Sequence, residues 1–187
     1  MPAVPWTVRP AEPGDAADWV EVHLRGLAET YPQMPPAFVG SRRARQTEIV
    51  ASTRAEIEDA GPDERYLVAL DADDALVGIG HATRGAQEWE RRLLARYPDD
   101  ALGLQRGVRD PGLRQLTTLY TVSRVHGSGV GGAMAEALVG DEPAYLWIMT
   151  GNDRAEAFYR RRGFRRVSAA VPSGPTWFAW PMFQMAR

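Results

Sequence analysis

Four glycines stand within six residues of this 187-residue chain, at Gly127, Gly129, Gly131 and Gly132. They lie between an apolar segment that reads as a strand and one that reads as a helix. The first N–H groups of a helix lack intrahelical acceptors and carry partial positive charge, and glycines let a phosphate approach the backbone closely. A turn that merely packs helix against sheet is the alternative, but four glycines at one junction favour a pyrophosphate cradle made of main chain.

The cradle could hold a dinucleotide. Gly127, Gly129 and Gly132 match G-x-G-x-x-G, and Asp153 stands at about the distance expected of the acid that binds a ribose. Two observations oppose an NAD-binding protein. Residues 123–126 separate the strand from the first glycine, and only 55 residues follow Gly132, too few for the remaining βαβ units. NAD binding is therefore the weaker alternative.

Two motifs in this part of the chain resemble the GNAT family of N-acetyltransferases. LYTVSRVHGSGVG, residues 119–131, resembles the acetyl-CoA motif, a hydrophobic strand followed by Q/R-x-x-G-x-G/A, with His126 where Gln or Arg is usual. NDRAEAFYRRRGF, residues 152–164, resembles the next motif, N-x-x-A-x-x-x-Y-x-x-x-G-F, at every position. Two motifs in the family's order are more specific than either alone.

The resemblance implies an acetyl-CoA-dependent N-acetyltransferase that transfers an acetyl group to a primary amine by direct attack in a ternary complex, with no metal. Main chain at the end of the strand would pair with the pantetheine amides, and the glycine amides would hold the pyrophosphate. The implied cofactor-binding residues are Thr121, Val122, Ser123, His126, Gly127, Ser128, Gly129, Val130, Gly131, Gly132, Asn152 and Arg161.

Tyr159 matches the family's general acid, which protonates the departing CoA thiolate. A phenol, with a pKa of about 10, can share a proton with a thiolate whose conjugate acid has a pKa of about 8.5. Each residue of this motif also has a structural explanation: Tyr159 as core, Asn152 as a helix N-cap, and Arg161 as a solvated charge at a helix C-terminus.

The acceptor amine must lose a proton before it attacks the thioester, because an aliphatic ammonium has a pKa of about 10. Family members often carry a glutamate on the strand equivalent to residues 116–122, which has no carboxylate here. His81 and His23 are candidate bases, although a lone histidine on an apolar face is more often structural. Deprotonation through solvent is the third alternative.

A catalytically silent CoA-binding sensor on the same fold is the main alternative function. The missing strand carboxylate favours it, and Tyr159 at the acid position counts against it. Small-molecule and peptide amines are both compatible acceptors, with specificity expected from residues 31–38, 84–114 and 172–175. Trp89 and Tyr97 either line an acceptor pocket or pack a helix over the sheet edge.

The elements predicted around these residues form an α/β fold, a single domain over residues 1–187 with a mixed central sheet and helices on both faces. The resemblance adds that the central strands splay apart. Strands are predicted over residues 4–10, 66–70, 76–83, 116–122, 145–149, 164–171 and 176–183. Helices are predicted from Gly14-Asp15 to about residue 30, over 41–60, 131–139 and 152–162, and as a short helix inside an insertion at about 84–114.

Composition removes several classes of chemistry. All 22 basic residues are arginine, which excludes Schiff-base lysines, Ser-Lys dyads and lysine-bearing phosphate loops. The absence of cysteine excludes disulfides, thiolate nucleophiles and Cys-based zinc sites. A net charge of −2 lacks the positive excess that is typical of proteins that bind nucleic acid. With no signal-like start and no membrane-length apolar run, a cytoplasmic protein is expected.

Arginine is thus the only cationic help that the phosphate site can recruit, near Arg124 and residues 160–162. The aromatic end, residues 177–183, is predicted as a core-facing last strand, with a homodimer contact as a role for any exposed remainder.

Overall fold

The computed structural model describes residues 5–97 and 112–187. These residues divide into two compact units, the first made of residues 5–83 and 117–141 and the second of residues 84–97, 112–116 and 142–187. The later part of the predicted insertion, residues 98–111, lies outside the described residues. The single domain predicted over the whole chain stays a prediction.

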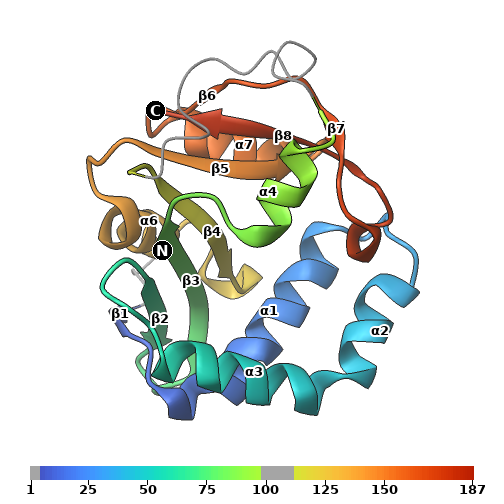
Figure 1. Ribbon diagram of the computed structural model, residues 1–187. Helices are drawn as coiled ribbons and strands as arrows, with labels where there is room; N and C mark the ends of the chain where they lie inside the picture. Colours follow the sequence, from blue (N-terminus) through green and yellow to red (C-terminus); the bar gives the residue numbers. More distant parts are fainter. Residues whose placement is uncertain (1–4, 98–111) are drawn as a thin grey trace. The chain divides into compact units, whose positions relative to one another are not determined.

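The first unit is built on a mostly antiparallel run of strands, in the order β1-β2-β3-β4 (Figure 1). Their bounds are Trp6–Pro10 for β1, Arg65–Asp71 for β2, Leu76–Arg84 for β3 and Arg114–Thr121 for β4. β2 and β3 form the predicted hairpin, with Tyr66 opposite His81 and an irregularity between Ala69 and Leu70. β1 pairs with β2, which places the N-terminal strand at the edge.

Helices cover both faces of these strands. The helices of the first unit are α1 (Ala16–Thr30), α2 (Ala37–Ala44), α3 (Gln46–Glu58) and α6 (Val130–Val139). Gly80 of β3 faces α6 so closely that an added Cβ would lie 2.5 Å from Leu138. The preceding residue, Ile79, points to the opposite face and shares a core with Trp19 and Val20 of α1.

The helix predicted over residues 41–60 is wrong: the chain forms α2 and α3, separated at Arg45. α2 starts early because Phe38 is buried, edge-on against Tyr31. α3 buries Ile57. In one straight helix these two side chains, 19 residues apart in the sequence, would point about 100° away from each other. A break lets each helix bury its own apolar side chain.

The second unit contains the first residues of β4 and the strands β5, β8 and β6 in that order, with β7 beside β8. Their bounds are Ala144–Met149 for β5, Arg165–Arg166 for β6, Val171–Pro172 for β7 and Pro181–Ala186 for β8. The parallel ladder between β4 and β5 joins Arg114 to Ala144 and Gln115 to Tyr145, at the start of both strands. Helices α4 (Glu88–Leu94) and α7 (Asp153–Arg160) lie on opposite faces of β5 and β8 (Figure 1).

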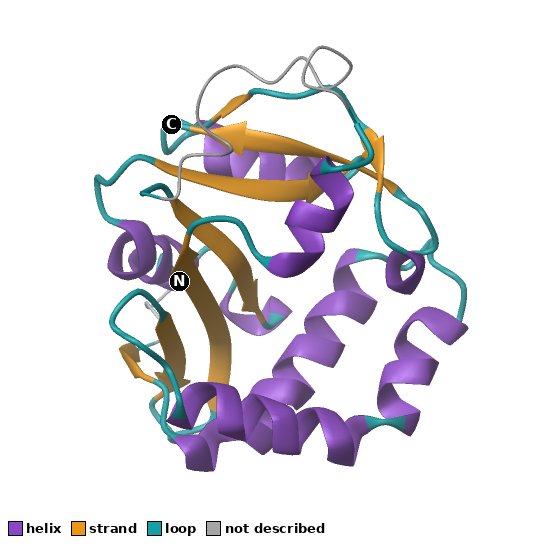
Figure 2. Cartoon of the chain, viewed as in Figure 1, coloured by secondary structure: helices purple, strands orange, loops and turns teal. Residues whose placement is uncertain are grey.

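The last part of the chain departs from the predicted strands over 164–171 and 176–183. Loop occupies most of the chain between α7 and β8 (Figure 2). The Ser168 hydroxyl accepts the Gln184 N–H at 2.8 Å, so a side chain replaces a ladder bond and the first strand is cut short. Phe178 and Ala179 have φ of 54° and 55°, a left-handed conformation that no strand accommodates. Phe178 is 49% exposed, and the predicted dimer contact here stays a prediction.

The fold class is confirmed: in the described part of the chain, eight strands, mostly antiparallel, form a mixed α/β fold with helices. β4 and β5 pair in parallel, whereas β1 with β2, β2 with β3, and β8 with β5, β6 and β7 pair antiparallel. The splay of the central strands stays a prediction. Among the helices of residues 5–97 and 112–187, none is long and apolar enough to cross a membrane.

Candidate functional site

Buried valines anchor the junction between β4 and α6. Val122, Val125 and Val130 are each at most 3% exposed, and they hold the start, the middle and the end of the turn in the core of the first unit. Gly127 and Gly129, between them, are exposed. The apolar residues therefore fix the loop while its main chain faces outward.

The loop leaves main-chain N–H groups without acceptors. Gly127 and Gly129 have φ of 83° and 94°, the left-handed region that glycine adopts without a Cβ penalty. Gly132 turns its N–H back to the Gly129 carbonyl at 2.9 Å. Within the described residues, the N–H groups of Gly127, Gly129 and Gly131 have no acceptor. Three donors thus stand together at the start of α6, where the helix dipole favours an anion.

Two further side chains steady this loop, and sequence reasoning missed both roles. The Trp6 indole N–H of β1 donates to the Ser128 carbonyl at 3.3 Å. Arg124 forms an ion pair with Asp71 at the end of β2. This guanidinium holds the pKa of Asp71 below its usual range. Arg124 is therefore directed at the β2–β3 hairpin by a contact that lies far away in sequence.

Two of the three residues expected to pair with pantetheine, Val122 and Thr121, differ in their main-chain contacts. Val122 donates its N–H to Val77 at 2.9 Å and accepts from the Val125 N–H at 3.2 Å, so both of its groups are engaged. Directions alternate along a strand, and the Thr121 carbonyl therefore points away from β3. It is reached by the His126 ring, whose Nε2 lies 3.1 Å from the oxygen.

His81, one of the candidate bases, is part of a buried stack. Its ring lies flat on Tyr66, with centroids 4.0 Å apart. The Thr117 hydroxyl donates to the His81 carbonyl at 2.9 Å and lies 2.7 Å from Nδ1. Because a hydroxyl has one proton, Nδ1–H is the donor in the second contact and Nε2 keeps its lone pair, 3.6 Å from Glu64 Oε1.

Both candidate bases are poorly basic. Burial lowers the pKa of His81 to about 4. Burial, with a smaller contribution from the Arg42 charge, lowers the pKa of His23 to about 4 as well. The His23 ring lies 5.1 Å from that of Tyr120 on β4. Neutral, weakly basic imidazoles at these positions fit a structural role better than the role of a base.

In the second unit, α7 carries the remaining predicted site residues. Asn152 caps the helix, since its Oδ1 accepts the Ala155 N–H at 3.2 Å. Tyr159 is 8% exposed, with the rings of Phe158 and Phe164 at 5.0 and 5.6 Å. Arg161 is exposed at the C-cap. The structure thus groups residues 121–132 in one unit and Asn152, Tyr159 and Arg161 in the other.

The second unit also holds a buried carboxylate that sequence reasoning missed. Glu90 of α4 is 0% exposed. It accepts from Tyr145 Oη at 2.9 Å and from Trp147 Nε1 and Gln184 Nε2 at 3.0 Å each. Burial raises the pKa of Glu90, against hydrogen bonds from the Trp147, Tyr145 and Gln184 side chains and the Gln87 main chain, which favour its charged form. One signal was present: Leu93 and Leu94 follow at i+3 and i+4, so Glu90 lies on the apolar side of its helix.

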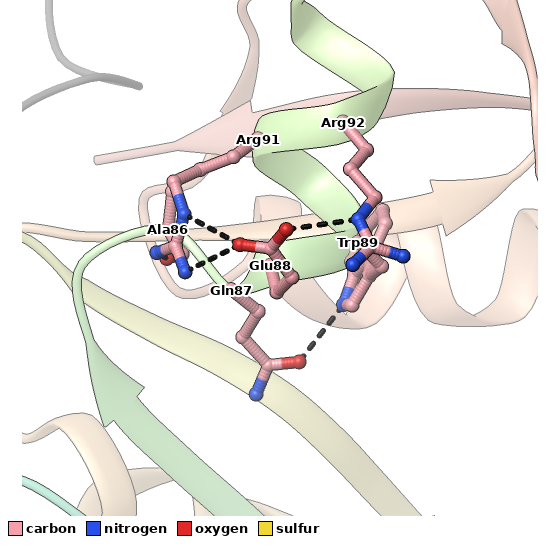
Figure 3. Close-up of polar contacts among 6 residues, drawn as sticks. All are labelled: Ala86, Gln87, Glu88, Trp89, Arg91 and Arg92. Atoms are coloured by element: carbon pink, nitrogen blue, oxygen red, sulfur yellow. Dashed lines mark hydrogen bonds and ion pairs between the residues drawn. The ribbon is translucent and has the colours of Figure 1, made fainter.

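The exposed side of α4 carries ion pairs between neighbouring side chains (Figure 3). The Glu88 carboxylate lies 2.8 Å from both Arg91 Nη2 and Arg92 Nε. Trp89 donates its indole N–H to Gln87 Oε1 at 2.8 Å. It is 43% exposed, and its ring meets that of Trp147 on β5 at a centroid distance of 6.1 Å. These contacts match a helix that covers the sheet, one of the two alternatives weighed for Trp89.

Residues 5–97 and 112–187 contain no group of three or more histidine, aspartate and glutamate side chains that could hold a metal ion. Three predicted features, the strand, the glycine loop and the capped helix with its tyrosine, lie where the two motifs place them in the chain.

Solved structures share the fold over nearly the whole chain. One, described as histone acetyltransferase HPA2 and related acetyltransferase from Corynebacterium glutamicum, is 25% identical, with a TM-score of 0.61 over 97% of this chain and 94% of that one. The PaiA N-acetyltransferase from Thermoplasma acidophilum, solved with coenzyme A, is 14% identical, with a TM-score of 0.60 over 96% and 98%. A phosphinothricin acetyltransferase from Sinorhizobium meliloti, solved with AcCoA, is 18% identical, with a TM-score of 0.60 over 97% and 87%.

No curated protein matches the sequence. Residues 27–164, which include both motifs, match the acetyltransferase (GNAT) family. This match covers well over half of the chain, and it confirms the resemblance noted in the sequence. The chain belongs to the acetyltransferase (GNAT) family.

Proposed function

We propose that the protein is an acetyl-CoA-dependent N-acetyltransferase that acts on a primary amine of a small molecule or peptide. The observation that carries the proposal is the set of N–H groups at Gly127, Gly129 and Gly131, which find no acceptor among the described residues. Backbone donors at a helix N-terminus suit a pyrophosphate. Family membership, the coenzyme A in one of the similar structures and the AcCoA in another support acetyl-CoA as the ligand.

The main chain before the loop would hold the pantetheine arm as an added strand does. The Thr121 carbonyl and the Ser123 N–H are the groups we assign to this pairing. Both Val122 groups already serve Val77 and Val125, so this residue contributes through its position and not through a hydrogen bond.

Acetyl-CoA supplies an activated thioester, and the amine attacks its carbonyl carbon directly while the C–S bond breaks. The chain has no cysteine for a thiolate acyl-enzyme. We assign Tyr159 as the general acid that gives a proton to the departing sulfur. The ring is held between Phe158 and Phe164, which restricts the directions in which its hydroxyl can point.

The ammonium proton leaves to solvent. His81 and His23, with pKa values lowered to about 4, hold a proton far less readily than an amine does. We therefore infer that a water path or the neutral fraction of the amine replaces the carboxylate that relatives carry on the strand.

Thiol release from acetyl-CoA across a panel of polyamines, aminoglycosides, amino acids and peptides tests the proposal. We expect release with at least one amine, and a drop in kcat of about 100-fold for Tyr159→Phe, the scale of general acid catalysis. Tyr66→Phe removes a phenol outside the proposed machinery and serves as the control. Tight binding of acetyl-CoA without release for any amine would instead support the silent sensor.

The NAD alternative is tested by thermal melting. A ligand that binds the folded state raises the melting temperature. We expect CoA at saturating concentration to stabilise the protein and NAD(H) to leave the melting temperature unchanged. Stabilisation by NAD(H) and none by CoA would overturn the cofactor assignment.

A further inference from the structure

The imidazole of His81 presents an acceptor that no described residue uses. The residue is 9% exposed, and its ring is fixed by the stack on Tyr66 and the contact with Thr117. Nδ1 carries the proton toward Thr117, so Nε2 keeps a lone pair. This nitrogen is buried and has no hydrogen-bond partner among the described residues. Buried acceptors are nearly always paired, so this lone pair suits a donor that comes from outside the chain.

A second acceptor, the Glu64 carboxylate, lies beside the first. Glu64 directly precedes β2, and its Oε1 lies 3.6 Å from His81 Nε2. Because burial lowers the pKa of His81 to about 4, neither atom brings a proton to the other at neutral pH. Two lone pairs therefore face each other, and a donor between them would satisfy both. The Glu64 side chain is 34% exposed, so the pair is reached from solvent on the Glu64 side.

The chain that leads to Glu64 is strongly acidic. Residues 55–64, the end of α3 and the turn to β2, contain no basic residue and five acidic ones: Glu56, Glu58, Asp59, Asp63 and Glu64. Burial and, to a smaller extent, the charge of Glu56 raise the pKa of Glu64. Within the part of the chain that the structure describes, no arginine pairs with the Glu64 carboxylate. These surroundings favour a ligand that carries positive charge.

An ammonium group fits these acceptors better than a metal ion does. It has three N–H donors, and its nitrogen can lie about 2.9 Å from both His81 Nε2 and the Glu64 carboxylate. The bond to the carboxylate is charge-assisted and therefore strong. A metal ion needs more ligands, and the described residues offer no group of three histidine, aspartate and glutamate side chains that could hold one. In this role His81 accepts a hydrogen bond and need not be basic.

We propose that His81 and Glu64 bind the second ammonium group of a diamine or polyamine acceptor whose other end is acetylated. This inference rests on the proposed function and names the class of its acceptor. Thr117, which contacts the His81 ring, lies four residues before Thr121 on β4. At about 3.4 Å per residue, about 14 Å of strand separates the two, and Thr121 is assigned to pantetheine. A long aliphatic chain therefore suits the site better than a short one.

Initial rates with 1,8-diaminooctane and 8-amino-1-octanol test the proposal, because the two acceptors differ only in the distal group. For the wild type we expect the KM of the diamine to be about 10-fold lower, the scale of one hydrogen bond to a charged group, with a similar kcat. Glu64→Gln should raise the KM of the diamine to that of the amino alcohol. Glu58→Gln, which removes a charge from the same acidic segment, is the matched control and should keep the preference.

The role of His81 has its own readout in nitrogen-15 NMR of the imidazoles. The His81 signals are assigned by their loss in His81→Gln. We expect the Nε2 signal to move when 1,8-diaminooctane is added and to stay in place with 8-amino-1-octanol, because only the diamine brings the distal ammonium. An Nε2 signal that stays in place with both compounds would overturn the role of His81 in the site.

Calorimetric titration of 1,8-diaminooctane without acetyl-CoA measures binding apart from turnover. We expect about 10-fold weaker binding by Glu64→Gln than by the wild type and Glu58→Gln. Equal KM values for the two acceptors, or a preference that survives in Glu64→Gln, would overturn this inference and leave the proposed function intact. If no amine released thiol, the proposed function would be overturned; binding that depends on Glu64 would then still support the ammonium site, and equal binding by Glu64→Gln would overturn that site as well.

Discussion

The glycine loop of the first unit and the Glu90 cluster of the second treat polar groups in opposite ways. In the loop, the N–H groups of Gly127, Gly129 and Gly131 meet no acceptor among the described residues, and the chain there is largely exposed. In the cluster, a carboxylate that is 0% exposed meets three donors, from Tyr145, Trp147 and Gln184. The first region leaves main-chain donors without acceptors among the described residues, and in the second region three side-chain donors reach one buried acceptor.

The difference follows from solvation. A buried polar group without a partner costs about 1–3 kcal/mol, and more when it is charged. At the surface, water satisfies an amide until a ligand replaces it, so an incomplete set of hydrogen bonds is tolerated there. We therefore interpret unpaired main-chain donors on an exposed loop as a feature for binding, and a buried carboxylate that accepts from three side chains as a feature of the architecture. Each region can be tested by asking whether its disruption affects stability or ligand affinity.

The largest effect is expected from Glu90→Ala. It leaves the Tyr145 hydroxyl, the Trp147 indole and the Gln184 amide buried without their acceptor. We expect the free energy of unfolding to fall by about 3–5 kcal/mol, the scale for removing one member of a buried charged network, measured by chemical denaturation.

Glu90→Gln keeps the volume and one acceptor oxygen, so a loss of about 1–2 kcal/mol is expected for it. Both variants, while folded, should bind CoA as the wild type does. A change below 1 kcal/mol for Glu90→Ala would contradict the architectural role of the cluster.

His81 combines features of both regions: its ring is buried, but its Nε2 has no hydrogen-bond partner among the described residues. Its pKa of about 4 in the folded protein lies below the value of about 6.5 in an unfolded chain. The unfolded state thus binds more protons between these values, and stability is lost as the pH falls through this window. We expect a loss of about 2 kcal/mol between pH 7 and 5 from this residue, and His23, with the same direction of shift, adds to it.

Denaturation curves at pH 5, 6 and 7 for the wild type and His81→Gln measure this contribution. The variant should show a flatter dependence on pH, because one titrating group is gone. Equal slopes for the two proteins would show that the His81 ring already carries its proton when folded. His81 would then be a buried group whose charge is compensated in the folded protein.

What the sequence predicted well was local. The strand, glycine loop and helix were placed within one or two residues (predicted 116–122 and 131–139, observed β4 and α6), because glycines and an apolar run act through their immediate neighbours. The Glu90 cluster joins residues 55 to 94 positions apart, and no local pattern shows which strands a helix will cover. The ion pair between Asp71 and Arg124 was not predicted for the same reason.

The prediction of the last strands was wrong for a different reason. Residues 177–180 have the aromatic composition of a strand, but Phe178 and Ala179 adopt left-handed backbone. That conformation is imposed by the turn from Gly174 and by the Trp180 indole, which donates to the Thr150 carbonyl at 3.0 Å. β-propensity describes how a side chain fits a pleated surface and cannot anticipate a distant acceptor.

Gly129→Ala tests the binding side of the comparison. At φ of 94° an alanine is strained by about 1 kcal/mol or more, and relief of that strain would re-aim the amides of the loop. We expect the Kd for CoA to rise about 10-fold, a loss of about 1.4 kcal/mol, measured by calorimetry.

Gly40→Ala is the matched control, since Gly40 lies within α2 with open space around it and without a positive φ. It should stabilise the protein slightly and leave the Kd for CoA unchanged. If Gly129→Ala lowered stability but left affinity unchanged, the loop would belong with the architectural region.

The smallest effect is expected at Asn152, where one side chain could serve both purposes. Its Oδ1 caps α7 by accepting the Ala155 N–H, and loss of such a cap costs about 1 kcal/mol. Asn152→Ala should lower the free energy of unfolding by this amount, whereas Asn152→Asp keeps an acceptor and should leave it nearly unchanged.

The aspartate in Asn152→Asp carries a negative charge, and an anion beside a polyphosphate ligand is repelled. A normal melting temperature with a several-fold weaker Kd for CoA in Asn152→Asp would therefore assign a binding role beyond the cap, and unchanged affinity would make Asn152 a purely structural residue of the motif.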